Sequence, residues 1–208
     1  MNWTEFATIA VAHLFAVASP GPDFAVVTRQ SVTVGTRAGI WTSAGVGAGI
    51  LLHVAYCLLG VALLLSQSPR LFAMVKLIAA AYLFYLGVTS IVRASRQANN
   101  NAPDANGGTA FNPGRAFALG FLTNGLNPKA TLFFLALFAV VISPATPTTV
   151  QMVYGIYLAL ATFLWFTMLS RLIGLSPVRN FLLRSGVWFE RGMGAILIGL
   201  AAQIALTS

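Results

Sequence analysis

The sequence predicts an all-α protein that crosses a membrane several times. Of its 208 residues, 58% are hydrophobic and 8% are charged, whereas soluble domains carry about 25% charged residues. No charged residue occurs between Ala38 and Pro69 or between Ala130 and Ser170. As one helix, the second run would be about 60 Å long, about twice the thickness of a bilayer's hydrocarbon core. It must therefore turn back once, and the sequence SPATPTT (143–149) supplies the turn.

Apolar runs and turn signals together predict six membrane spans. They lie at roughly 6–28, 38–66, 70–92, 115–142, 149–172 and 186–206. The loops after the first, third and fifth spans hold most of the basic residues: Arg29, Arg37, Arg93, Arg96, Arg115, Arg171, Arg179 and Arg184. The opposite side holds only Arg70, so the positive-inside rule places both termini outside the cytoplasm. The net charge of +8 therefore indicates orientation in a lipid bilayer and not a nucleic-acid partner.

The two halves of the chain share a pattern. Ser19-Pro20 recurs as Asn127-Pro128, and Ser68-Pro69 recurs as Ser176-Pro177, both at an offset of 108 residues. Three spans separate equivalent points, so the two copies face opposite ways across the membrane. We expect two inverted three-helix repeats (1–92 and 115–208) joined by a cytoplasmic linker (93–114). Many secondary transporters have this layout, with the site where interrupted helices meet.

The first and fourth spans are both broken, and each break carries a charge. The residues that break the helices are Pro20, Gly21, Pro22 and Pro128. Asp23 follows the first break and Lys129 the second. An ionisable group at the centre of a membrane helix costs about 2.5–3.5 kcal/mol, which favours pairing, a hydrated cavity, or both. The plainer alternative is that Asp23 caps the helix after Pro22 and Lys129 extends to the cytoplasmic surface.

Other polar or small residues of the spans have more than one interpretation. Asn124 and Asn127 flank the second break, where Asn124 either binds ligand or satisfies freed carbonyl groups. His53 lies in the middle of its span, where it either lines the pathway or relays protons, or bonds to a neighbouring helix. The glycines at 45, 47 and 49 predict close helix packing, with a sliding surface as the weaker option.

Three motifs make the chain resemble a known family. They are SPGPDFAVVTRQS followed by GTRAG (35–39), KLIAAAYLFYLGV (76–88) and GFLTNGLNPKATLFFLALF (120–138). In this order and spacing the chain resembles, over nearly its whole length, the bacterial amino-acid exporters of the lysine exporter and homoserine/threonine resistance group (LysE/RhtB).

The resemblance implies a secondary transporter of the bacterial inner membrane, without a cofactor and without enzymatic activity. It implies export of small amino acids or derivatives, such as homoserine, threonine or homoserine lactone, driven by protons. By this resemblance, the two helix breaks of the family correspond to 20–23 and 127–129 of this chain. The resemblance also places Gly35, Arg37 and Gly39 in the first cytoplasmic loop. Asp23 stands where other members carry Asn, which argues against a protonation role common to the whole family.

The sequence leads to one hypothesis with two rivals. In the hypothesis, Asp23 receives the ammonium of an amino acid and Lys129 its carboxylate. The first rival is an effluxer of metal ions or other small solutes, but two His, one Cys and four acidic residues form no cluster at ligand spacing. The second is a non-transporting scaffold or passive channel, although a scaffold does not need two charged helix breaks. The sequence does not determine the oligomeric state.

Overall fold

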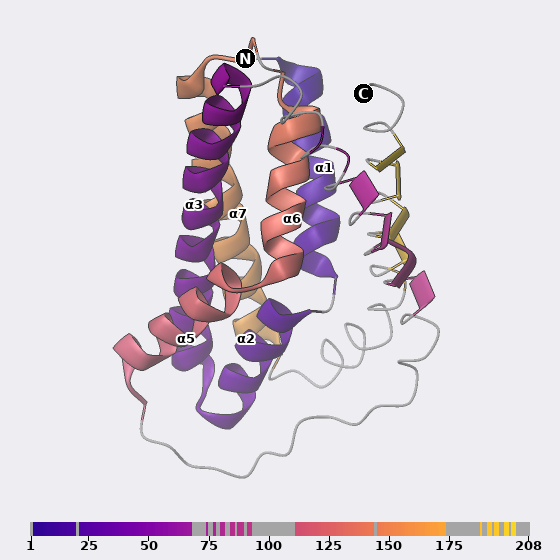
Figure 1. Ribbon diagram of the computed structural model, residues 1–208. Helices are drawn as coiled ribbons and strands as arrows, with labels where there is room; N and C mark the ends of the chain where they lie inside the picture. The colour runs from indigo at the N-terminus through magenta and orange to yellow at the C-terminus, as the bar shows by residue number, and fades with distance from the viewer. Residues whose placement is uncertain are drawn as a thin grey trace.

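The structure, a computed structural model, describes residues 2–19, 21–67, 111–143 and 145–173, with further single residues within 74–92 and 188–202. The helices are α1 (Trp3–Ala18), α2 (Pro22–Thr33), α3 (Thr36–Gln67), α5 (Pro113–Gly125), α6 (Pro128–Ala136), the π-helix η2 (Leu137–Val141) and α7 (Thr148–Leu172) (Figure 1). Every residue described within 74–92 and 188–202 is also helical, and the described part of the chain contains no strand. The prediction of an all-α protein is confirmed. Pro20, residues 93–110 of the linker, six of the thirteen residues of the motif at 76–88, and most of the third and sixth spans lie outside the described residues.

Within the part of the chain that the structure describes, two helices are long and apolar enough to cross a membrane. They are the Thr36–Gly60 part of α3 and the whole of α7. The pair α1 and α2 forms a third candidate span, which is bent by 52° at its break. These elements match the predicted spans at 38–66, 149–172 and 6–28, and they make the chain a polytopic membrane protein.

Local chemistry explains where the broken helices stop and restart. The chain leaves α1 through Ser19, whose backbone is extended, and α2 begins with Pro22 at its first position. At the second break the chain passes through Asn127, whose backbone is also extended, and α6 begins with Pro128. Here the Asn127 side chain in addition caps α6 by accepting the Lys129 backbone N–H at 3.0 Å. Proline is favoured at a first helical position, where its missing N–H would have no partner in any case.

The helix bounds repeat at the offset found in the sequence. Moved by 108 residues, the bounds of α1 become 111–126, and α5 spans 113–125. The bounds of α2 become 130–141, and α6 and η2 together span 128–141. The bounds of α3 become 144–175, and α7 spans 148–172. In Figure 1, α1 and α2 run away from the N-terminal end, whereas α5 and α6 run back towards it. The two sets of helices therefore run in opposite directions.

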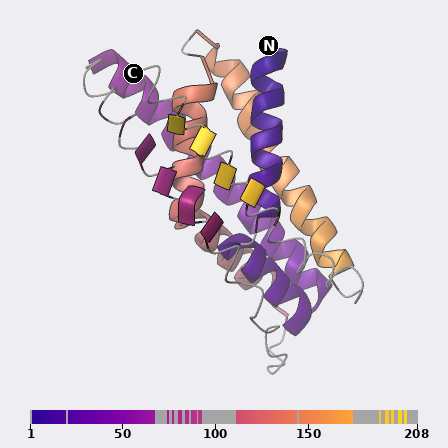
Figure 2. The ribbon, with the colours of Figure 1, turned by 90° about the vertical axis from the view of Figure 1, so that its right-hand side faces the viewer.

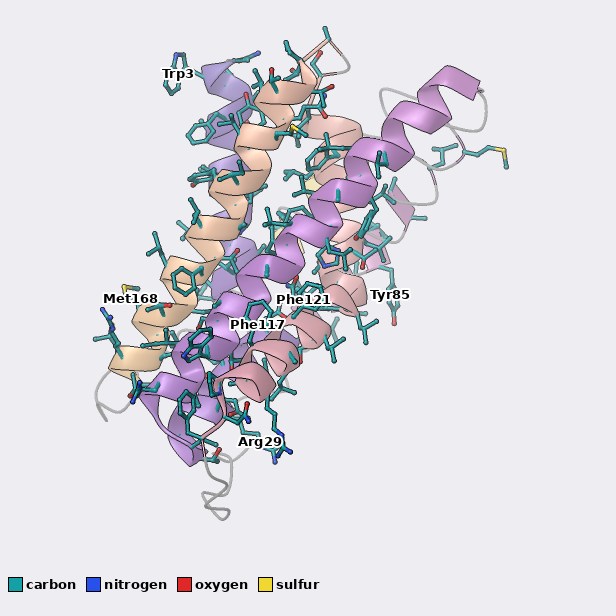
Figure 3. All side chains as sticks on the ribbon, turned by 90° about the vertical axis from the view of Figure 1, so that its left-hand side faces the viewer. Trp3, Arg29, Tyr85, Phe117, Phe121 and Met168 are labelled. Atoms are coloured by element: carbon teal, nitrogen blue, oxygen red, sulfur yellow. The ribbon has the colours of Figure 1, made fainter. Side chains whose placement is uncertain are left out.

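Glycines bring the helices into backbone contact around α3. A Cβ atom on Gly45 would lie 2.0 Å from the Phe117 carbonyl oxygen, and one on Gly120 would lie 2.1 Å from the Thr42 carbonyl oxygen. Figure 3 shows Phe117 and Phe121 on α5, beside α3. On its other side α3 meets α7, where a Cβ on Gly47 would lie 3.0 Å from the Ala159 carbonyl oxygen. The prediction of close helix packing is confirmed.

Two apolar clusters form the core. The first packs Ile9, Phe134 and Tyr154 with their neighbours, and the second packs Val27, Phe166 and Ile173. Each contributes a phenylalanine, Phe134 or Phe166, to the wall of one cavity. The cavity therefore lies between the two clusters.

Four arginines gather at one end of the molecule. Trp3 and Arg29 lie at opposite ends (Figure 3). At the end that holds Arg29, α3 and α5 begin and α7 ends (Figure 1). Arg37, Arg115 and Arg171, which occupy those helix termini, therefore gather at the same end as Arg29.

Candidate functional site

The two helix breaks meet, and each bonds to the other. Lys129, from the second break, donates through Nζ to Ser19 Oγ of the first break at 2.9 Å. In return Asp23, from the first break, accepts through Oδ2 from Asn127 Nδ2 of the second at 3.4 Å. These residues are more than 100 positions apart in the chain. Only the fold brings them together.

Asp23 faces the second half of the chain. Its Oδ2 also accepts from Asn124 Nδ2 at 2.9 Å, and the positive charge of Lys129 acts on the same carboxylate. Its Oδ1 is buried and has no hydrogen-bond partner among the described residues. Asp23 does not cap its own helix through a hydrogen bond, because the N-cap of α2 is Gly21 and no side chain bonds there. A buried carboxylate oxygen without a donor is unfavourable, so this atom is suited to receive one from a ligand.

Lys129 points into the protein. Its bond to Ser19 Oγ does not fit the alternative in which it extends to the cytoplasmic surface. Gly21 lies beside it, because a Cβ atom on Gly21 would lie 3.8 Å from Lys129 Nζ, an ordinary van der Waals distance.

A cavity opens at the meeting point of the breaks. The volume open to the centre of a water molecule is about 50 Å³, whereas one water needs roughly 10–15 Å³ on this measure. Its polar lining consists of His13, Ser19, Asp23, Asn124, Asn127, Lys129 and Thr162. Apolar residues such as Ile50, Phe133 and Phe166 form the remaining wall, and Gly21 and Pro22 also line it. The cavity therefore joins an acidic and a basic group to an apolar wall within a small volume.

His53 lies behind the cavity and not on its surface. Its Nε2 is 3.0 Å from the Asn124 carbonyl oxygen, and its ring stacks on Phe134. Since a carbonyl oxygen only accepts, Nε2 carries the hydrogen and Nδ1 accepts from the Tyr56 hydroxyl. A carbonyl has no proton to pass on, so this path does not lead a proton from His53 to Asp23. Of the two interpretations of His53, the geometry matches the bond to a neighbouring helix.

The GTRAG residues lie away from the cavity. Gly35 lies in the turn between α2 and α3, whereas Arg37 and Gly39, which were predicted to lie in the loop, belong to the beginning of α3 because the helix starts at Thr36. Gly35 has a φ of +119°, which side chains rarely adopt, and its N–H bonds to the Gln30 carbonyl oxygen. A Cβ on Gly39 would lie 2.0 Å from Ser31 Oγ, so a larger residue there would clash. Arg37 is exposed and stacks over the Phe111 ring at 5.6 Å.

Three polar residues that line the cavity, Ser19, His13 and Thr162, were not selected from the sequence. Ser19 was part of the quoted motif but was considered only as a member of the repeated Ser-Pro pattern. His13 was detectable in principle, because an ionisable residue in an apolar span is a functional candidate. Thr162, which lies 2.8 Å from His13 Nε2, carries no distinguishing signal in the sequence. Only the contact between α1 and α7, which lie side by side in Figure 2, brings the pair together.

Comparison with known proteins shows to which family the chain belongs. The model of the LysE type translocator matches residues 14–208. The chain belongs to the LysE-type translocator family. The family resemblance of the sequence motifs is therefore confirmed, and members of this family are transporters and not enzymes.

Relatives of this LysE-type translocator cover most of its length. A threonine efflux protein of Escherichia coli is 28% identical over 97% of this chain and 98% of its own. An uncharacterised membrane protein of Pseudomonas aeruginosa is 30% identical over 97% of this chain and 95% of its own. A leucine efflux protein of Salmonella choleraesuis is 34% identical over 68% of this chain and 65% of its own. No solved structure matches the chain.

Proposed function

We propose that this LysE-type translocator is a secondary active transporter that exports small amino acids or their derivatives from the cytoplasm. The observation that carries the proposal is the meeting of Asp23 and Lys129 in one cavity. An amino acid carries one positive and one negative group on the same carbon atom. A site with one acidic and one basic side chain a short distance apart is complementary to that pair of charges.

The cavity offers a binding side chain for each of the two charged groups of the amino acid. The ammonium group binds the Asp23 carboxylate, whose Oδ1 lacks a donor among the described residues. The carboxylate binds Lys129 Nζ beside Ser19 Oγ. The first turn of α2 adds to this site, because a helix N-terminus presents amide donors to an anion and no side chain caps α2.

The names of the relatives support an amino acid as the substrate. Both relatives with a named activity are efflux proteins, one for threonine and one for leucine. The polar groups that these two amino acids share are their α-ammonium and α-carboxylate groups. Those are the groups to which Asp23 and Lys129 are complementary, so recognition at the breaks accounts for what the substrates have in common.

Contacts between equivalent positions support an inverted repeat. An offset of 108 residues carries Gly21 onto Lys129, and these two positions face each other across the cavity. The same offset carries Gly87 to position 195. Gly194, the residue before position 195, lies against the Gly87 carbonyl oxygen. Residues related by a two-fold axis touch only where they lie close to that axis. We therefore propose six spans in two inverted three-helix repeats (1–92 and 115–208) around an axis through the cavity.

The apolar clusters on either side of the cavity serve as two gates in this proposal. Opening the cluster around Phe166 admits substrate from the end that holds Arg29, which is cytoplasmic by the positive-inside rule. Opening the cluster around Phe134 releases it on the other side of the inner membrane, where both termini lie. Entry of protons along their gradient drives the cycle.

Liposomes that contain the purified protein test the proposal. They are loaded with a panel of radiolabelled amino acids, and efflux is compared with that from protein-free liposomes. We expect protein-dependent efflux of at least one small amino acid without a measurable ionic current. Absence of efflux across the panel would favour a scaffold or a metal-ion effluxer, and a measurable current would favour a channel.

A further inference from the structure

The cavity holds a second polar pair that belongs to neither helix break. His13 on α1 and Thr162 on α7 both line it, and His13 Nε2 lies 2.8 Å from Thr162 Oγ1. His13 is 3% exposed and Thr162 is 1% exposed. The pair therefore places an imidazole and a hydroxyl group inside the same small space as Asp23 and Lys129.

This pair retains hydrogen-bonding capacity for a ligand. Among the described residues, Thr162 is the one hydrogen-bond partner of His13. An imidazole has two ring nitrogens, and a hydroxyl group has one donor and two acceptor positions, so one bond leaves both groups with further capacity. Burying such capacity in an apolar wall is unfavourable unless a partner meets it. The two side chains are thus poorly explained by packing alone.

The position of the pair suggests which part of a substrate it meets. With the ammonium and carboxylate groups held at the breaks, the side chain of an amino acid projects towards the rest of the cavity. That remainder consists of the apolar wall, including Ala16 and Phe133, and the His13–Thr162 pair. His13 also precedes residues 14–208, which match the family model, so the family assignment gives it no role.

We propose that the His13–Thr162 pair is the specificity subsite for the side chain of the substrate. It selects a small side chain that carries a hydroxyl group over an aliphatic one of the same shape. The inference rests on the proposed function, because it takes the transported molecule to be an amino acid. A hydroxyl group bonds to the pair, whereas a methyl group in its place leaves the polar atoms of the pair without a partner.

Threonine and valine are suitable probes, because they differ only by a hydroxyl group in place of a methyl group. Exchange of each radiolabelled probe is measured in liposomes at concentrations well below saturation. The wild type should exchange threonine at least about tenfold faster than valine, as expected for one hydrogen bond that is lost together with the penalty of an unpaired group. Thr162→Val and His13→Leu should each bring this ratio close to one.

Two further variants separate recognition from folding. Thr162→Ser keeps the hydroxyl group and should keep the preference for threonine. Thr167→Val is the matched control, because Thr167 is a buried threonine on the same helix that does not line the cavity. It should leave the ratio of the wild type unchanged.

The possible outcomes distinguish this inference from the proposed function. The inference is overturned if Thr162→Val and His13→Leu transport with the ratio of the wild type. It is also overturned if the wild type exchanges valine as fast as threonine, or exchanges other amino acids but neither probe. If the wild type exchanges no amino acid at all, the proposed function fails first and the subsite fails with it.

Discussion

Lys129 and Ser19 are 110 positions apart in the chain, yet the Lys129 ammonium donates a hydrogen bond to the Ser19 hydroxyl at 2.9 Å. Asp23 in turn accepts a hydrogen bond from Asn127 of the second break. The offset of 108 residues carries Ser19 onto Asn127, so the two neutral partners occupy equivalent positions. Each break thus supplies one charged residue and one neutral residue that bonds to the charge of the other. This exchange of partners holds the two halves together at the cavity.

The bond between Ser19 and Lys129 should contribute to substrate affinity. Ser19→Ala removes one hydrogen bond to an ammonium group, worth about 1.5–3 kcal/mol when one partner is charged. Because Ser19 helps to hold Lys129 Nζ in place, we expect the concentration for half-maximal transport to rise about tenfold or more. Ser31→Ala is the control, since Ser31 bonds to Val27 within its own helix. A Ser19→Ala protein with the affinity of the wild type would contradict this role.

Asp23 should couple transport to protons as well as bind substrate. In Asp23→Asn the side chain keeps its shape but neither ionises nor carries a proton. We expect exchange of substrate at reduced affinity, and no acceleration when a pH gradient is imposed across the liposome membrane. If the gradient still accelerates efflux by Asp23→Asn, the coupling proton is carried elsewhere.

Glu5 should stabilise the end of the molecule opposite to Arg29. Its buried carboxylate accepts from the Ser143 N–H at 2.7 Å, from Thr146 Oγ1 at 3.1 Å and from the Tyr154 hydroxyl at 3.3 Å. Glu5→Ala leaves these donors unpaired, at about 1–3 kcal/mol for each group that stays buried. We expect a lower midpoint of thermal unfolding in detergent, with a smaller loss in Glu5→Gln. Equal midpoints for the wild type and Glu5→Ala would show that these bonds add no stability.

Gly120 should tolerate no side chain. A Cβ atom at this position would lie 2.1 Å from the Thr42 carbonyl oxygen, so α5 and α3 would have to separate. We expect Gly120→Ala to lower the thermal midpoint or to abolish folded expression. Gly60→Ala is the matched control, because no atom of the described residues lies within 4 Å of a Cβ there, and alanine favours a helix by about 0.5–1 kcal/mol. Equal stability of the two variants would be evidence against the tight contact of α3 with α5.

Much of the fold was predictable, because the bilayer imposes strong rules on the sequence. Apolar length alone located α3 and α7, and the Pro-containing motifs located both breaks. Repetition of these motifs at one offset predicted that the breaks correspond to each other. The π-helix η2 was not predictable, since LFAVV carries no signal that separates it from an ordinary helical turn.

The site was predictable only where a residue was unusual for its surroundings. Asp23 and Lys129 were selected because charges are costly in a membrane, and the structure brings them to one cavity with Asn124 and Asn127. His53 was selected for the same reason but lies behind the cavity, because the direction of a side chain depends on the packing of helices that are distant in sequence. His13 met the same criterion, but no local pattern revealed its partner Thr162 on another helix.

The central claim is that Lys129 binds the carboxylate of the substrate and Asp23 its ammonium. Its most direct test is competition between the exported amino acid and its primary amide, which keeps the ammonium group but has no negative charge. The wild type should prefer the acid to the amide, Lys129→Met should lose that preference, and Asp23→Asn should retain it. If Lys129→Met still prefers the acid as strongly as the wild type, the carboxylate is bound elsewhere and the assignment of the site is wrong.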